Sequence, residues 1–466
     1  MHLLPIAGRG GLGYTLLRGG PMAIDWTRAG DEAISHMGAM LRLETTNPPG
    51  QEMLAAEYLA GVLRGAGIEP TIVTLAPGRG NMVARLKGTG AEDPLLLYGH
   101  TDVVPAEPAK WRHPPFGGEV ADGMIWGRGA IDMKGMVVQS LMVVLLLKRE
   151  GLALKRDLIF AATADEEVDG AGIKQLVTHA PELIRAGWGL TETGGFPMYV
   201  GGRRMYPIKT AEKGTLWLTL RARGRAGHAS LPTPDNPVAR LSTALARLTR
   251  RDLRFALTEH SAGYLRALGE VIGGELGQAV AQVNSTRETK RVMRRLGDAQ
   301  LSGHLYAVLH NTAVPTVIRA GQKTNVIPSE AEARVDCRSL PGVSAEELLA
   351  EVRAALGPHI EISVDDSSPP LEVSTQTRLY DVLGATLRAH DSQAVVTPYM
   401  LGGATDAKHV AELGVRTYGF SPLFLEPGEP YAELVHSHDE RIPVRGFLWG
   451  MRVLYDAVHA FCVAEG

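Results

Sequence analysis

A group of histidine and carboxylate side chains falls where short apolar runs of the sequence pass into loops. Its members are His100, Asp102, Asp132, Glu166, Glu167 and Glu192, and a further histidine, His436, follows far downstream. Imidazole nitrogens and carboxylate oxygens bind divalent metals, and they also transfer protons during hydrolysis. The types and spacing of these residues therefore predict a two-metal hydrolytic centre.

Such a centre needs one carboxylate that bridges ions ~3.5–4 Å apart. Asp132 is the candidate, because the glycines around it let the backbone pass close to the ions. His100 is a candidate terminal ligand, and Asp102 can orient its imidazole or simply form a turn. Of the adjacent Glu166 and Glu167, one can bind metal and the other can act as the general base. The alternative is that they are simply a solvated pair of charges, as two adjacent glutamates usually are.

Alternating strands and helices are expected to position these side chains. Apolar runs at 95–98 and 158–163 are typical of buried strands, and helical segments at 133–149 and 173–179 follow them. This alternation predicts an α/β fold with a doubly wound, mostly parallel sheet. Ligands of such sheets bind at the carboxyl ends of the strands, which is where the acidic residues fall.

The length of 466 residues predicts two domains. From about residue 211 apolar residues alternate with polar ones, which indicates a separate α+β domain inserted in the first. We expect a catalytic domain at 22–210 and 369–466, and a lid or dimerisation domain at 211–368 with an exit hinge at 367–370. Residues 1–21 lack the apolar core of a signal peptide, so they are expected to be a tail or to precede a true start at Met22 rather than Met1.

Composition excludes several classes of function. The net charge of −3 gives no electrostatic case for nucleic acid or an anionic membrane as partner. The longest apolar run, 136–147, is shorter than the ~20 residues that span a bilayer. The two cysteines, Cys337 and Cys462, cannot form a disulfide framework, which favours a reducing cytoplasm.

Several short motifs occur in a fixed order along the chain. They are Thr46-Asn47-Pro48-Pro49-Gly50, Gly99-His100-Thr101-Asp102, Gly127-Arg128-Gly129, Asp132-Met133-Lys134-Gly135, Asp165-Glu166-Glu167, Gly227-His228, Thr324-Asn325-Val326-Ile327-Pro328, Asp336-Cys337-Arg338, Gly402-Gly403-Ala404-Thr405-Asp406 and His436-Ser437-His438-Asp439-Glu440. Together they resemble the M20 zinc metallopeptidases, which include aminoacylase, acetylornithine deacetylase, succinyl-diaminopimelate desuccinylase, carnosinase and glutamate carboxypeptidase. The resemblance extends from Met22 to the C-terminus.

The resemblance implies two Zn²⁺ ions, for which Co²⁺ or Mn²⁺ could substitute. It implies that His100 and Glu192 hold one ion, that Glu167 and His436 hold the other, and that Asp132 bridges them.

Two of these ligands have a competitor in the sequence. Glu182 precedes Glu192 but falls on a predicted helix. His438 shares one face of an extended segment with His436, and the family's pattern selects His436 as the ligand. The remaining histidines fit no site and are expected to be surface or core residues; these are His113, His179, His390 and His409.

The resemblance further implies that Glu166 is the general base and that His228, in the inserted domain, donates a hydrogen bond to the tetrahedral oxyanion. In many relatives this histidine comes from the partner subunit, so a homodimer through the inserted domain is expected. The alternative is that the long lid replaces a partner subunit within one chain. The rival interpretation is that His228 caps a glycine-rich turn.

The same resemblance implies a binding site for a substrate carboxylate, formed by Asn325, Arg338, Gly402 and Gly403. An arginine is suited to this role because its guanidinium pairs bidentately with a carboxylate and stays charged. The alternative is that Arg338 forms a structural ion pair with Asp336.

The implied reaction is hydrolysis of an amide bond beside a free carboxylate, by a broad exopeptidase or dipeptidase. The alternative is an N-acyl-amino-acid deacylase of the aminoacylase, acetylornithine or succinyl-diaminopimelate type. Segments 201–203 and 211–214 resemble the carnosinase and carboxypeptidase S branches, and segment 254–301 exceeds the compact lid of the biosynthetic deacylases. A remote rival, a metal-dependent binding protein without turnover, is opposed by the complete set of expected ligands.

Overall fold

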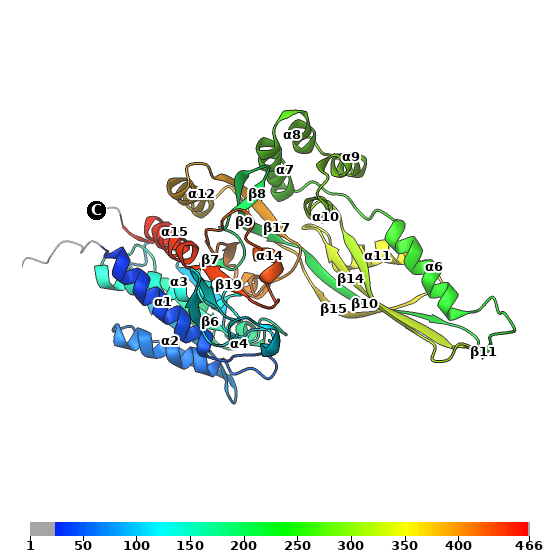
Figure 1. The fold of residues 1–466 in the computed structure, drawn as a ribbon, viewed down its shortest axis with the longest axis horizontal. Helices are drawn as coiled ribbons and strands as arrows, with labels where there is room; N and C mark the ends of the chain where they lie inside the picture. Colours follow the sequence, from blue (N-terminus) through cyan, green and yellow to red (C-terminus); the bar gives the residue numbers. More distant parts are fainter. Residues whose placement is uncertain (1–23, 465–466) are drawn as a thin grey trace, which may run out of the picture.

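The computed structural model describes residues 24–464 of the chain. The expected start at Met22 and the tail at 1–21 lie outside the described residues. Within them the chain forms a mixed α/β fold with two main sheets, one compact and one extending away from it (Figure 1). None of the described helices is long and apolar enough to cross a membrane.

The larger sheet has ten strands among the described residues, in the order β1-β2-β6-β3-β7-β18-β9-β16, with β8 and β17 also paired to β9. The strands are β1 (Thr71–Ala76), β2 (Arg79–Leu86), β3 (Leu95–His100), β6 (Leu158–Thr163), β7 (Trp188–Thr191), β8 (Met198–Val200), β9 (Arg203–Glu212), β16 (Leu371–Glu372), β17 (Val395–Leu401) and β18 (Arg416–Gly419). The central strands β6, β3, β7 and β18 are parallel. The predicted mostly parallel α/β sheet is therefore confirmed.

Helices cover both faces of this sheet because alternate residues of its central strands point in opposite directions. Leu95 and Leu97 of β3 join the main core, whereas Leu96 and Tyr98 join a smaller core on the other face. The main core is built with α1 (Trp26–Arg42), α2 (Met53–Gly65), α3 (Lys134–Glu150), α12 (Arg378–His390) and α15 (Val444–Cys462). The smaller core is covered by α4 (Ala171–His179), α5 (Pro181–Ile184) and α13 (Ala407–Val410).

The second sheet has four antiparallel strands in the order β12-β14-β10-β15. They are β10 (Gly214–Arg223), β12 (Thr312–Ala320), β14 (Glu330–Ser339) and β15 (Glu361–Ser368), and they pack against α6 (Pro237–Arg250) and α11 (Ala345–Leu356). A two-stranded antiparallel sheet of β11 (Gly227–His228) and β13 (Val326–Ile327), which we call the far ribbon, lies at the far end of this sheet, away from the large sheet (Figure 1).

Four helices connect α6 to β12, and they pack beside the larger sheet through contacts of α7 with β9 and β17. They are α7 (Glu259–Ile272), α8 (Gly274–Ala281), α9 (Thr286–Leu296) and α10 (Ala299–Ala307). A capping box between Thr258 and Ser261 begins α7, and glycines 273 and 297, both with positive φ, end α7 and α9.

A small sheet and a short helix complete the surroundings of the site. The sheet consists of β4 (Glu119–Ala121), β5 (Met124–Trp126) and β19 (Arg441–Pro443), and the helix is α14 (Tyr431–Leu434). Because β19 pairs with β5, the segment after His436 lies beside the glycine-rich segment that carries Asp132.

The prediction of an exit hinge at 367–370 is wrong for residues 367 and 368. Ser367 and Ser368 are the last residues of β15, where they pair with Leu216 and Thr215 of β10. Their polar side chains suit this strand because most of it is solvent-exposed. The chain leaves the four-stranded sheet at Pro369, and the domain bounds at 211 and 368 stay a prediction.

Candidate metal and catalytic site

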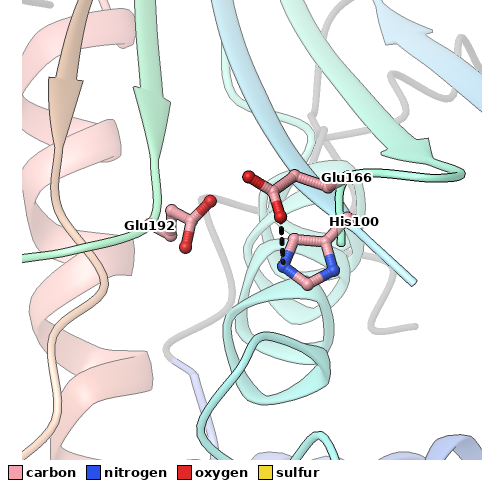
Figure 2. A group of neighbouring side chains, drawn as sticks. All are labelled: His100, Glu166 and Glu192. Atoms are coloured by element: carbon pink, nitrogen blue, oxygen red, sulfur yellow. Dashed lines mark ion pairs between the residues drawn. The ribbon is translucent and has the colours of Figure 1, made fainter. Parts of the chain in front are cut away.

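Three neighbouring parallel strands bring the predicted site residues together. His100 is the last residue of β3, Glu192 comes directly after β7, and Glu166 and Glu167 follow β6. Because β6, β3 and β7 are adjacent, their carboxyl ends share one edge of the sheet. Figure 2 shows His100, Glu166 and Glu192 facing one another, with one candidate ligand atom of each within 4.8 Å of the others.

Asp132 lies between two histidines, and each of its oxygens faces one of them. Its Oδ1 is 3.1 Å from Nε2 of His100, and its Oδ2 is 3.2 Å from Nε2 of His436. The same nitrogen of His436 is 3.2 Å from Oε2 of Glu167. A candidate ligand atom of Glu167 is also within 4.8 Å of those of His100 and Asp132. The carboxylate of Asp132 thus separates two groups of donors.

The site concentrates negative charge in a poorly hydrated place. Burial raises the pKa of Glu166 to about 8 although His100 opposes it, and burial together with the charge of Glu166 raises that of Glu192. Hydrogen bonds to Asp132 and Glu167 raise the pKa of His436 to about 10. Such a carboxylate cluster is stabilised by cations.

The donor set fits divalent cations. Two imidazoles and three carboxylates are ligands of the kind that zinc and related transition metals take in proteins. Oε1 of Glu167 is buried and has no hydrogen-bond partner among the described residues, as expected for an oxygen that binds an ion.

Each of the two uncertain ligands had a competitor. The fold brings Glu192, and not Glu182, to the cluster, and it brings His436 there instead of His438. His438 instead faces Glu107, at 3.9 Å, and Glu182 lies on α5 as expected. The functional assignment of Glu192 and His436 stays a prediction.

Asp102 makes different contacts from those expected. Nδ1 of His100 is 3.0 Å from the backbone oxygen of Asp102 but 3.6 Å from its carboxylate. The carboxylate instead accepts hydrogen bonds from the backbone N–H groups of Glu166 and Glu167, both at 3.1 Å, and from Nδ2 of Asn47 at 2.9 Å. Asp102 therefore holds the segment that carries the candidate base.

Glu440 is a buried residue that the sequence analysis gave no role. Its carboxylate accepts hydrogen bonds from the backbone N–H groups of Gly129, Ile131 and Asp132, and it pairs with the guanidinium of Arg128 at 2.6 Å. These contacts fix the backbone on which Asp132 stands, and the peptide bond after Asp132 is cis. The signal for Glu440 was its place in the motif that contains His436.

Asp406 is a second residue without an assigned role. It is buried, it accepts a hydrogen bond from the hydroxyl of Thr163, and burial raises its pKa to about 7 against the opposing charge of His100. Asp406 therefore adds a further carboxylate beside the cluster, behind Glu166.

A cavity of about 810 Å³ opens beside Glu166, and it is lined by segments that follow strands β6 and β17 of the large sheet and by strands β10, β14 and β15 of the four-stranded sheet. Arg338 of β14 and Gly403 both line it, together with Lys174, Lys408 and His409. His409, which was expected to be a surface or core residue, thus lies at the wall of this cavity. His113, His179 and His390 lie elsewhere, beside Glu119, Thr178 and Asp456.

Arg338 and Asn325 also have partners of their own, within the four-stranded sheet and at its far end. Arg338 pairs bidentately with Asp336, at 2.6 and 2.9 Å, as the structural alternative predicted. Asn325 and His228 lie together at the exposed far ribbon, where the backbone oxygen of Asn325 accepts a hydrogen bond from the N–H of Ala229. Within one chain the fold does not bring His228 to the carboxylate cluster (Figure 1).

Imidazole and carboxylate groups clustered at the carboxyl ends of a parallel sheet define a metal-dependent hydrolase. The chain belongs to peptidase family M20/M25/M40, whose model matches residues 96–460. It is accordingly an enzyme of the metallopeptidase and amidohydrolase class, which hydrolyses amide bonds.

Similar proteins and a similar solved structure support this family assignment. The chain is 29% identical over 372 residues to an N-fatty-acyl-amino acid synthase/hydrolase of Xenopus tropicalis, covering 75% of this chain and 69% of the relative. It is 27% identical over 386 residues to a probable carboxypeptidase S-like protein of Dictyostelium discoideum, covering 76% and 69%. Its fold is similar to that of an M20 family metallo-carboxypeptidase from Sulfolobus solfataricus, with a TM-score of 0.67, 18% identity and coverage of 92% and 98%.

Proposed function

We propose that the carboxylate cluster holds two Zn²⁺ ions and hydrolyses an amide bond beside a free carboxylate. The position of Asp132, with one oxygen toward His100 and the other toward His436, is the observation that carries this proposal. His100 and Glu192 would hold one ion, and Glu167 and His436 the other. Co²⁺ or Mn²⁺ could replace zinc, because they accept the same nitrogen and oxygen ligands.

Glu166 is the general base of the proposed reaction. Bound zinc supplies Lewis acidity and lowers the pKa of water to ~7. Glu166 takes the proton of the attacking water and then gives it to the leaving amine. Its carboxylate lies 3.9 Å from Nε2 of His100, at the proposed ion site, where a general base is required.

The substrate carboxylate is proposed to bind in the 810 Å³ cavity beside Glu166. Arg338 and Gly403 line this cavity, as do Lys174 and Lys408. Acidic side chains line it as well, namely Asp169, Asp365, Asp366 and Asp406. A broad exopeptidase or dipeptidase fits this site. An N-acyl-amino-acid deacylase is the alternative, because its substrates also carry a carboxylate next to the scissile amide. The relatives include both kinds of hydrolase.

A homodimer through the four-stranded sheet is proposed to complete the site. His228 and Asn325 lie at the far ribbon, so a second copy of the chain would have to bring them to the substrate. The edge strand β12 offers exposed apolar side chains for such a contact, with Val314 55% and Ile318 58% exposed. The two cysteines are free and buried, which supports the proposal of a reducing cytoplasmic location.

The first experiment is release of primary amine by zinc-loaded protein from two panels, dipeptides and N-acyl amino acids. Glu166→Gln, which keeps the size of the side chain but cannot take a proton, is expected to lower kcat by ~10²–10⁴ in both. Turnover of dipeptides favours the exopeptidase, and turnover confined to acyl substrates favours the deacylase. The absence of turnover in both panels would overturn the proposed reaction.

Metal content is measured separately from activity. Chelation followed by titration with Zn²⁺ is expected to restore activity at two ions per chain, and Asp132→Asn is expected to reduce the bound zinc. A native mass spectrum with two ions in Asp132→Asn would contradict the bridging role.

A further inference from the structure

A cavity of about 920 Å³ lies between the helical segment α7–α10 and two further segments of the chain, 196–201 and 425–435. Rings line it from several elements, namely those of Phe196, Tyr199, His304, Tyr399 and Tyr431. We call this space the aromatic cavity. Its volume is within the range of small-molecule pockets, ~300–1,000 Å³, so it can hold a group that carries a ring.

The aromatic cavity adjoins the carboxylate cluster. Val435 lines it, and the next residue, His436, has its Nε2 3.2 Å from Oδ2 of Asp132. Tyr431 lines it as well, and besides burial the charges of Asp132 and Glu192 raise the pKa of its phenol. A substrate whose amide lies at the cluster can therefore extend one of its two ends into this cavity.

The charges at the aromatic cavity decide which end of the substrate enters it. Among the described residues that line it there is no lysine or arginine, whereas four are acidic: Asp298, Glu426, Glu429 and Glu433. The cavity beside Glu166 contains Arg338 and two lysines in addition to its own acidic residues. The end that carries the substrate carboxylate is thus repelled from the aromatic cavity, and the acyl side of the amide faces it.

Two buried polar atoms at the wall formed by α7 and α10 have no hydrogen-bond partner among the described residues. They are the hydroxyl of Tyr264, a residue that is 1% exposed, and Nε2 of His304. The ring of Tyr264 meets that of His304 edge-on at 5.2 Å between centroids, and His304 stacks on Tyr399 at 4.9 Å. Because an unpaired buried polar group lowers stability, its retention in a native protein indicates a use.

The chemistry of these two atoms selects the group that would pair with them. Burial, together with the charge of Lys213, lowers the pKa of His304 to about 4, so its imidazole is neutral at pH 7. The unpaired nitrogen then either donates or accepts, depending on the tautomer, and a hydroxyl can do both. A hydroxyl on the ligand therefore matches either tautomer of His304 and the phenol of Tyr264, whereas a carbonyl or an N–H group matches one tautomer only.

We propose that the aromatic cavity binds the side chain of the residue on the acyl side of the scissile amide, and that this side chain is preferably a phenol. The preferred substrates are then dipeptides with an N-terminal tyrosine. This inference rests on the proposed function and deepens it, because it names the substrate class among the dipeptides considered. Tyr264 and His304 are the residues that set this specificity.

A series of dipeptides with one C-terminal alanine tests the preference. Zinc-loaded protein is given the tyrosyl, phenylalanyl, leucyl and glutamyl compounds. We expect kcat/KM of the tyrosyl compound to exceed that of the phenylalanyl compound roughly threefold to tenfold, the effect of about one hydrogen bond. Leucyl should follow phenylalanyl because it lacks a ring, and glutamyl should be poorest because of the acidic lining. Equal rates for tyrosyl and phenylalanyl, or a faster leucyl compound, would overturn the proposal.

Two tyrosine-to-phenylalanine changes locate the preference. Tyr264→Phe removes the unpaired hydroxyl, so the ratio of tyrosyl to phenylalanyl kcat/KM should fall to about one, while the melting temperature stays or rises. Tyr306→Phe is the matched control on α10, because the hydroxyl of Tyr306 donates to Asp252 at 3.1 Å and neither residue lines the cavity. It should keep the ratio and lower the melting temperature. A lower melting temperature for Tyr264→Phe would show that its hydroxyl already has a partner in the free protein, which contradicts the proposal.

The imidazole is tested in the same way. His304→Phe keeps a ring to stack on Tyr399 but removes the nitrogen, and it should also bring the ratio to about one. It serves as the second variant if Tyr264→Phe does not fold. An unchanged ratio in both variants would place the phenol of the substrate elsewhere.

A binding measurement separates this inference from the proposed reaction. Calorimetry with zinc-loaded Glu166→Gln is expected to give a dissociation constant for tyrosyl-alanine roughly threefold to tenfold below that for phenylalanyl-alanine. Adding Tyr264→Phe should remove this difference. Failure of the reaction appears as no turnover of any substrate, whereas failure of the inference appears as binding that ignores the hydroxyl. Turnover confined to N-acyl amino acids would overturn the inference and leave amide hydrolysis intact.

Discussion

Asp102 shows how a residue can serve a site through backbone contacts. Its carboxylate accepts two backbone N–H groups, those of Glu166 and Glu167, so it orients the candidate base and a candidate ligand together. The imidazole of His100 is held by the backbone oxygen of the same residue. A single aspartate thus connects both donor groups of the cluster.

Replacing Asp102 should therefore impair catalysis more than substrate binding. Asp102→Asn turns an acceptor oxygen into a donor amide that faces N–H groups, and residues that orient ligands typically contribute 10–100-fold. We expect kcat to fall by about this factor with KM nearly unchanged, and zinc affinity to fall as well. Asp31→Asn on the exposed face of α1 is the control. An increase of KM alone would indicate a role in binding substrate instead.

The sequence could predict residues that act through their own chemistry, such as His100 or Glu166. It could not predict the role of Glu440, although this residue belongs to the motif His436-Ser437-His438-Asp439-Glu440. Apart from the guanidinium of Arg128, its partners are backbone N–H groups around Gly129, more than 300 positions away in the chain. Backbone donors have no residue type to reveal them, so only the fold shows such contacts.

Among the secondary-structure elements, the sequence predicted strands whose residues are all buried and mostly apolar, but it did not predict a strand that buries charged residues. The strands β3 and β6 are entirely buried and consist of apolar runs that indicate a strand. The strand β9 was not predicted, because it contains Lys209 and Glu212. Both are buried and pair with each other, and Thr405 accepts from Lys209 at 2.9 Å. Their mutual neutralisation depends on the folded structure.

An ion pair between elements gives a pH-dependent prediction. Asp391, after α12, accepts from Arg204 of β9 at 2.6 and 2.8 Å and from the hydroxyl of Tyr206 at 2.7 Å. Despite burial, these contacts lower the pKa of Asp391. The folded protein then binds fewer protons than the unfolded one at acidic pH. The stabilisation is thus complete above the unfolded value of ~3.9 and is lost as the pH falls through the lower folded pKa.

Asp391→Asn should lower the free energy of unfolding by ~1.5–3 kcal/mol at pH 7, as expected for hydrogen bonds to a charged group. The difference from the unmodified protein should shrink as the pH falls below ~4. Thermal unfolding followed between pH 3 and pH 7 measures it, with Asp31→Asn as the reference. A difference that stayed constant across this range would show that the charge of Asp391 is not involved.

At the scale of the whole molecule, the sequence predicted an inserted domain but not where its residues lie. Arg338 and His228 both fall within its predicted bounds, yet Arg338 lines the cavity beside Glu166 and His228 lies at the far ribbon. Strand length explains the separation. The ten residues of β10 advance the chain by roughly 33 Å at ~3.3 Å per residue. Residues of one domain can thus serve different sites.

The same separation leads to a prediction about assembly. If a second chain supplies His228, Glu166→Gln and His228→Ala are each inactive alone, because one lacks the base and the other an oxyanion donor worth ~10²–10³ in rate. A mixed dimer then has one intact site, since Glu166 comes from one chain and His228 from the other. Equal amounts that exchange freely should recover about a quarter of the unmodified activity, a fraction that follows from random pairing. Ile318→Glu on β12 should abolish both the dimer, measured by light scattering, and this recovery. No recovery in a mixture shown to contain mixed dimers would place His228 outside the active site.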